Sequence, residues 1–157
     1  MQIKYNPISD SRTLTYEPTK EEVKLGRELH KQNVRTVLNK ICDYLRERSN
    51  RHDWSIDETF DEYYQTVIDA YNSKDPEYFR NTPWYANHGN KERHHLEEFP
   101  RPSEDLLTDL TETIIDSTVR AKEMGVKSKI RELDKDYIYQ IFLNTCDKLE
   151  ELIEVTL

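Results

Sequence analysis

The stretch SEDLLTDLTETIIDSTVRAKEMG, residues 103–125, predicts the fold class most clearly. Its apolar residues recur at the three- and four-residue spacing of an amphipathic helix. They are Leu106, Leu107, Leu110, Ile114 and Ala121. Gly125 then supplies the residue type that most often follows the last turn of a helix. Because such a helix must bury its apolar face, we expect it to pack against other helices.

Two capping boxes predict where further helices begin. Thr19 and Glu22 have the spacing of a capping box, which predicts a helix that runs to about residues 48–50. Ser55 and Glu58 have the same spacing and predict a second helix, which continues through the apolar residues up to position 71.

The remaining segments complete an all-α prediction. No stretch alternates convincingly between apolar and polar residues, and the chain contains only three glycines. Residues 1–18 are predicted to be an extended N-terminal segment, and residues 72–102, with their prolines, short helices and turns. The last helix is expected over about residues 134–156. The sequence therefore predicts a single-domain helical bundle over residues 19–157.

Composition and charge exclude several classes of function. The 157 residues carry 23 basic and 31 acidic side chains, a net charge of −8, which disfavours binding to nucleic acid. No apolar run approaches the roughly 20 residues of a membrane span, and the N-terminus lacks an apolar signal region. Cys42 and Cys146 lie far apart, so neither a disulfide framework nor a zinc–thiolate site is expected. These features favour a cytoplasmic protein.

The histidines are the strongest candidates for a functional site. They are His30, His52, His88, His94 and His95. Three of them crowd into residues 88–95, and neutral imidazole is the commonest metal ligand in proteins. His30 lies in the apolar stripe of the first predicted helix, where it is either a core histidine bonded to a carbonyl group or a metal ligand.

Two acidic residues could complete a metal site. Asp53 follows His52 directly, just before a predicted helix, although a lone His-Asp pair indicates little by itself. Asp116 lies at the edge of the apolar face of the helix over residues 103–125. From there its carboxylate can reach inward to a metal ion or face solvent, and both alternatives stay open.

In chain order these residues give the pattern H, HD, H and D. This order resembles the HD superfamily of metal-dependent phosphohydrolases, which are all-helical. Three segments resemble, more narrowly, a small uncharacterised HD-like family of bacteria and phages: RHDWS at 51–55, NKERHHLE at 90–97 and LTETIID at 110–116. The resemblance covers about residues 24–150 and implies an HD-like helical domain.

The resemblance also implies a centre for one or two divalent metal ions, which would be Mn, Co, Ni, Fe, Mg or Zn. The implied ligands of the first ion are His30, His52, Asp53 and Asp116, and Asp53 is a candidate to bridge two ions. His88, with one or both of His94 and His95, would serve a second ion or hold the substrate phosphate.

The catalytic and phosphate-binding roles follow from the same resemblance. Many HD hydrolases carry a lysine three residues after the aspartate, where this chain has Ile56. That role would fall to Lys91 or Glu58, and Asp53 or a neighbouring carboxylate would accept the proton of metal-bound water. Two arginines, Arg51 and Arg93, are candidate phosphate contacts, with solvated surface charges as the alternative.

We therefore expect a metal-dependent phosphohydrolase that acts on a nucleotide or a similar small phosphate ester. A homo-oligomer is left open. The alternative is a non-catalytic helical interaction protein, for example one encoded by a phage and engaging a host protein, that retains an HD-like pocket. The aromatic residues Trp54, Trp84 and Tyr85 are expected to belong to the core rather than to stack on a base.

Overall fold

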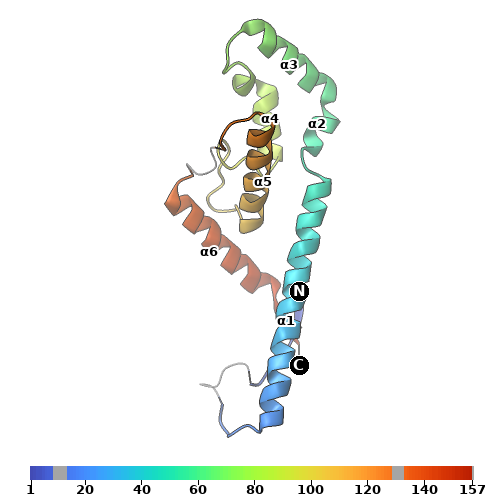
Figure 1. Ribbon diagram of the computed structural model, residues 1–157, viewed down its shortest axis with the longest axis vertical. Helices are drawn as coiled ribbons and strands as arrows, with labels where there is room; N and C mark the ends of the chain where they lie inside the picture. The colour runs from blue at the N-terminus through green and yellow to red at the C-terminus, as the bar shows by residue number, and fades with distance from the viewer. Residues whose placement is uncertain (9–13, 129–132, 157) are drawn as a thin grey trace. The chain divides into compact units, whose positions relative to one another are not determined.

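The chain is mostly helical in the computed structural model, which describes residues 1–8, 14–128 and 133–156 (Figure 1). One two-stranded sheet is the only sheet formed by these residues. The predicted all-α class is therefore confirmed. Within the described part of the chain, no helix is both long enough and apolar enough to cross a membrane.

The elements follow one another in a simple order. They are β1 (Gln2–Lys4), α1 (Lys20–Asn50), α2 (Trp54–Glu58), α3 (Phe60–Ser73), the 3-10 helix η2 (Phe79–Asn81), α4 (Pro83–Lys91), α5 (Leu107–Glu123), α6 (Lys135–Leu152) and β2 (Glu154–Thr156). They form two compact units: Met1–Asn50 with Asp147–Leu157, and Arg51–Cys146.

The first unit contains the long helix α1 and the short sheet. Parallel pairing of β1 with β2 sets Ile3 opposite Val155. The predicted capping box of α1 is confirmed, because the backbone N–H of Thr19 donates to Glu22 Oε2 at 2.7 Å and that of Glu22 donates to Thr19 Oγ1 at 3.2 Å. The start and end of this helix thus agree with the sequence prediction.

The second predicted capping box is wrong. Ser55 lies inside α2 and is buried, with its Oγ 2.8 Å from Nδ1 of His88. Its backbone N–H donates to Glu92 Oε1 at 2.9 Å rather than to Glu58. The backbone then leaves the helical region at Thr59, with φ −123°, so two helices replace the single predicted one. The physical reason is that Ser55 is engaged by the histidine cluster and is not free to cap.

Polar side chains fill much of the interior of the second unit. Its buried apolar residues are Trp84, Tyr85, Leu96, Leu110, Ala121 and Ile141. Its buried polar residues are Ser55, Thr66, His88, Glu92, His94, His95, Asp105, Asp109 and Thr113. The prediction that Trp84 and Tyr85 belong to the core is confirmed. Since buried polar groups are destabilising unless they find partners, polar contacts must organise this interior.

Two buried carboxylates hold the segment between α4 and α5. Asp109 accepts a hydrogen bond from the backbone N–H of Leu106 at 2.8 Å and so closes the first turn of α5. It also accepts from the guanidinium of Arg93 at 3.2 Å. Asp105 accepts from the hydroxyl of Tyr137 on α6, and burial together with this carboxylate raises the pKa of the tyrosine.

The helix α5 begins at Leu107 rather than near Ser103, and it ends as predicted. Gly125 has a φ of +70°, and its N–H donates to the carbonyl of Lys122 at 3.2 Å. This left-handed conformation is the one that favours glycine after the last helical turn.

Gly89 on α4 is a position where packing leaves no room for a side chain. A Cβ atom there would lie 2.1 Å from Cε2 of Phe99. We expect Gly89→Ala to lower the free energy of unfolding by about 1–3 kcal/mol, because the ring would have to move. Urea denaturation measures this change. At Gly125 a Cβ meets nothing within 4 Å, so Gly125→Ala, which carries only a backbone cost of about 1 kcal/mol, is the control. Unchanged stability of Gly89→Ala would contradict the packing.

Candidate metal centre

The second unit brings most of the predicted ligands together from separate segments. His52 and Asp53 lie in the turn before α2, and His88 lies on α4. The pair His94 and His95 follows α4 in a loop, and Asp116 comes from the middle of α5 (Figure 1).

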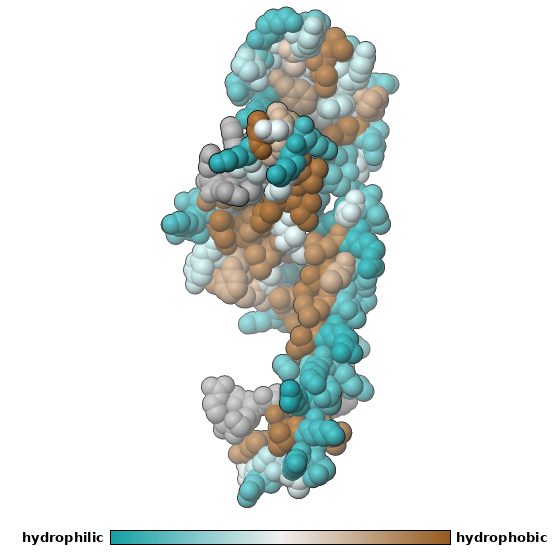
Figure 2. Space-filling model, in the orientation of Figure 1, coloured by the Kyte–Doolittle hydropathy of each residue, from teal (hydrophilic) through white to brown (hydrophobic). Residues whose placement is uncertain are grey.

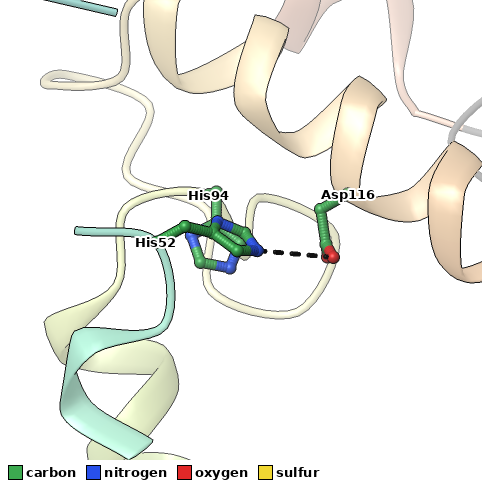
Figure 3. Close-up of side chains that lie close together, drawn as sticks. All are labelled: His52, His94 and Asp116. Carbon is green, nitrogen blue, oxygen red and sulfur yellow. Dashed lines mark ion pairs between the residues drawn. The ribbon is translucent and has the colours of Figure 1, made fainter. Parts of the chain in front are cut away.

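Six of these side chains form two groups, each close enough to hold a metal ion. The first group is His52, His94 and Asp116, and the second is Asp53, His88 and His95. In each group the three ligand atoms lie within 4.8 Å of one another. The rings of His52 and His94 lie 4.4 Å apart between centroids and overlap in the view of Figure 3, where a dashed line marks the ion pair of Asp116 with His52, 3.6 Å between Oδ1 and Nε2.

Asp53 faces both groups. Its Oδ1 lies 3.2 Å from His94 Nε2 and 3.7 Å from His88 Nε2, whereas its Oδ2 lies 3.8 Å from His52 Nε2. The backbone of Asp53 is left-handed, with φ 55°, a conformation that is costly for a residue other than glycine and is often found at functional sites. Oδ1 thus lies between an imidazole of each group, and Oδ2 faces a second imidazole of the first group, so this carboxylate is positioned to contact ions in both groups.

Two further side chains orient the histidine rings. Glu112 Oε1 lies 3.0 Å from Nδ1 of His52 and 3.3 Å from Nδ1 of His94. On the other side of the centre, Ser55 Oγ lies 2.8 Å from Nδ1 of His88. A partner at Nδ1 fixes the tautomer of a histidine and leaves the Nε2 lone pair for a metal. In addition, the ring of Trp84 stacks on His88 at 5.1 Å between centroids.

Sequence reasoning missed both orienting residues. Glu112 carries a usable signal, because it precedes Asp116 by one helical turn and therefore shares its face of α5. Ser55 carries none, since its partner His88 lies far along the chain and the local sequence predicts a capping role instead.

Unpartnered buried atoms support metal binding. Among the described residues, Asp53 Oδ1 and both ring nitrogens of His94 are buried without a hydrogen bond, since their neighbours lie at ion-pair distance but outside hydrogen-bond geometry. Each such atom destabilises a fold by about 1–3 kcal/mol. A cation would satisfy Asp53 Oδ1 and His94 Nε2, and Glu112 lies 3.3 Å from the remaining atom, His94 Nδ1. Imidazole and carboxylate donors together fit a divalent ion such as Mn, Fe, Co, Ni or Zn.

In the first group, His52 holds a second ring proton at neutral pH when no ion is bound. Hydrogen bonding with Asp116, and then with Glu112, raises the pKa of His52 to about 10. Burial alone would lower the pKa of His94, but the carboxylates of Asp53 and Glu112 outweigh it and raise that pKa. At neutral pH a metal ion must therefore displace the proton of His52.

The second group is ready to bind a cation at neutral pH. Burial, followed by the charge of His94, lowers the pKa of His95 to about 3. Burial likewise lowers the pKa of His88. Although burial alone would raise it, the surrounding imidazoles lower the pKa of Asp53 to about 2. This group therefore offers two neutral imidazoles and one ionised carboxylate. The two facing Nε2 atoms are hydrogen-bonded at 2.8 Å, and an ion would have to replace this bond and separate them to about 3.3 Å, the spacing of two nitrogen ligands in a tetrahedral site.

Metal binding should depend on pH in a defined direction. The imidazole of His52 must lose its proton to ligate, so Mn²⁺ binding at pH 7 should release about one proton. The affinity of the first group should rise up to about tenfold per pH unit between pH 7 and pH 9, for each proton released. Calorimetry in buffers of different ionisation enthalpy counts the protons. If Mn²⁺ binding released no proton and its affinity did not change with pH, the protonation state inferred for the first group would be wrong.

Other predicted site residues lie outside the two groups. His30 is exposed on α1 in the first unit, and neither group found among the described residues includes it. Glu58 is exposed at the end of α2. Arg51 and Lys91 both lie over the ring of Trp54, at 5.5 and 5.6 Å from its centre. The catalytic and phosphate-binding roles of these residues stay predictions.

Arg93 has a structural role in this arrangement. Its guanidinium contacts Asp109 at 3.2 Å and the carbonyl of Glu104 at 2.8 Å, and so links the loop after α4 to the start of α5. Contact with a substrate phosphate would compete with these bonds.

A pocket of about 360 Å³ opens beside the first group. His94, His95 and Asp116 lie at one part of its wall, and the cationic side chains on its wall are Arg80, Arg120 and Lys127. Sequence reasoning missed these cations. Arg120 follows Asp116 by one turn of α5, and this spacing is the signal that could have found it.

Comparison with known proteins identifies the family. The chain belongs to DUF5662, a family of unknown function whose model matches residues 21–155. No curated protein and no solved structure matches the chain significantly. The matched region contains both groups of ligands.

Proposed function

We propose that this member of DUF5662 is a metal-dependent phosphohydrolase with an HD-like centre, acting on a nucleotide or a similar small phosphate ester. One observation carries the proposal: two adjacent groups of imidazole and carboxylate ligands, with Asp53 facing both. Paired ligand groups of this kind suit the hydrolysis of phosphate esters, where two ions stabilise the attacking and the leaving oxygen.

The chain's own residues prepare the centre for this chemistry. His52, His94 and Asp116 would hold one ion, and Asp53, His88 and His95 the other. Bound divalent ions lower the pKa of water and neutralise charge on the phosphoryl oxygens.

The carboxylates divide into ligands and orienting groups. Because a carboxyl group with a pKa near 2 is ionised but only weakly basic, Asp53 is better suited to ligate than to accept a proton. Glu112 keeps the Nε2 atoms of His52 and His94 available by holding their Nδ1 atoms.

A second candidate function is a helical interaction protein that retains this pocket. Its support is an exposed aromatic flank on α3, where Phe60, Tyr64 and Tyr71 are 56%, 57% and 71% exposed. Aromatic side chains are enriched at protein interfaces. Figure 2 shows further hydrophobic residues on the surface that it draws, and exposed large hydrophobic residues occur in both units.

Phosphate release tests the two candidates. Chelator-treated protein reloaded with Mn²⁺, Co²⁺ or Ni²⁺ should release phosphate from at least one ester in a panel of nucleotides and sugar phosphates. Asp53→Asn should lower the rate at least about 100-fold, because it removes the carboxylate shared by both groups. Asp43→Asn, an exposed carboxylate of α1, is the matched control and should leave the rate unchanged.

A protein that binds these ions yet releases no phosphate from the whole panel would count against the phosphohydrolase. The interaction protein would then be the better proposal. A Phe60→Ser and Tyr64→Ser variant, compared with the wild type for binding of a partner protein, would test it.

A further inference from the structure

The pocket beside the first ligand group carries three cations, Arg80, Arg120 and Lys127, and three carboxylates, Glu97, Glu98 and Asp116. Besides Arg120 and Lys127, its wall carries the hydroxyl groups of Ser117 and Ser128, whose Oγ atoms are hydrogen-bonded at 2.7 Å. The third cation, Arg80, forms an ion pair with Glu98 at 3.3 Å. Two of the three cations, Arg80 and Arg120, therefore already form an ion pair with a carboxylate.

Arg120 is the cation coupled to the metal centre. Its NH2 group lies 3.2 Å from Oδ2 and 3.4 Å from Oδ1 of Asp116, one turn earlier on α5. The arginine side chain is 54% exposed, so solvent leaves it room to adopt another rotamer. It has two possible anionic partners, the carboxylate of a metal ligand and an anion in the pocket.

A bound metal ion changes the balance between these partners. When Asp116 ligates a cation, its negative charge is shared with that ion and attracts the arginine less. The guanidinium group can then turn to a phosphate oxygen, which it binds through two parallel hydrogen bonds. The distance along the helix is short enough for this exchange, because the two residues are neighbours on one face.

We propose that Arg120 is the phosphate-binding residue of this pocket and that it exchanges Asp116 for the substrate phosphate once the metal is bound. The inference rests on the proposed function and names the residue that recognises its substrate. A pocket of about 360 Å³ lies at the small end of small-molecule sites, and the rings of Phe79 and Tyr85 add apolar wall. It fits the organic part of a phosphate monoester of sugar or nucleoside size.

Calorimetry with inorganic phosphate tests the role of Arg120 without any turnover. Phosphate is titrated into the Mn²⁺-loaded wild type and into Arg120→Gln, Arg120→Lys and Arg46→Gln. The last variant is the matched control, because Arg46 forms an exposed pair with Asp43 on α1 at 2.9 Å. Arg120→Gln should weaken phosphate binding at least about tenfold, and Arg120→Lys should weaken it less. The affinity of Arg46→Gln for phosphate should equal that of the wild type.

A second titration, with Mn²⁺ alone, separates phosphate binding from support of the metal ligand. Arg120→Gln should bind Mn²⁺ as well as the wild type or more tightly, because a competitor for Asp116 is gone. The proposal is overturned if Arg120→Gln binds phosphate like the wild type, if the wild type binds no phosphate, or if the variant loses Mn²⁺ as well. Phosphate binding that depends on Arg120 in a protein that hydrolyses no ester would refute the proposed function but leave this inference standing.

Discussion

The contact of one carboxylate with two histidine rings holds the candidate centre together. Glu112 on α5 reaches His52 in the turn before α2 and His94 in the loop after α4, at 3.0 and 3.3 Å. Three segments of the second unit therefore meet at a single side chain. Because Glu112 lies on the Nδ1 side of both rings, their Nε2 atoms point toward Asp53 and Asp116, and this orientation creates the first ligand group beside Asp53 of the second.

The polar interior of the second unit gives this contact its importance. Among the described residues of this unit, as many histidines and carboxylates as apolar side chains are buried. Asp53 and His94 contribute buried atoms that find no hydrogen bond among the described residues. In such an interior a bound cation would stabilise the fold as well as supply chemistry, because binding to the folded state adds directly to its stability. Folding and function would thus depend on the same residues.

Local signals in the sequence predicted the helices better than the site. The capping box at Thr19 and the glycine at position 125 act within one helical turn, so the sequence predicts both correctly. Ser55 was predicted as a cap, but it bonds His88, a residue from another helix that no local pattern reveals. The ligand types could be predicted from the sequence because histidine and aspartate have distinctive chemistry. Their division into two groups, with His30 in neither, depends on tertiary packing.

Anomalous X-ray scattering from crystals grown with Mn²⁺ tests the central claim most directly. We expect two peaks: one among His52, His94 and Asp116, and a second among Asp53, His88 and His95. Asp53 should contact both. Crystals that hold no Mn²⁺ at these residues, or hold it only elsewhere on the chain, would contradict the account.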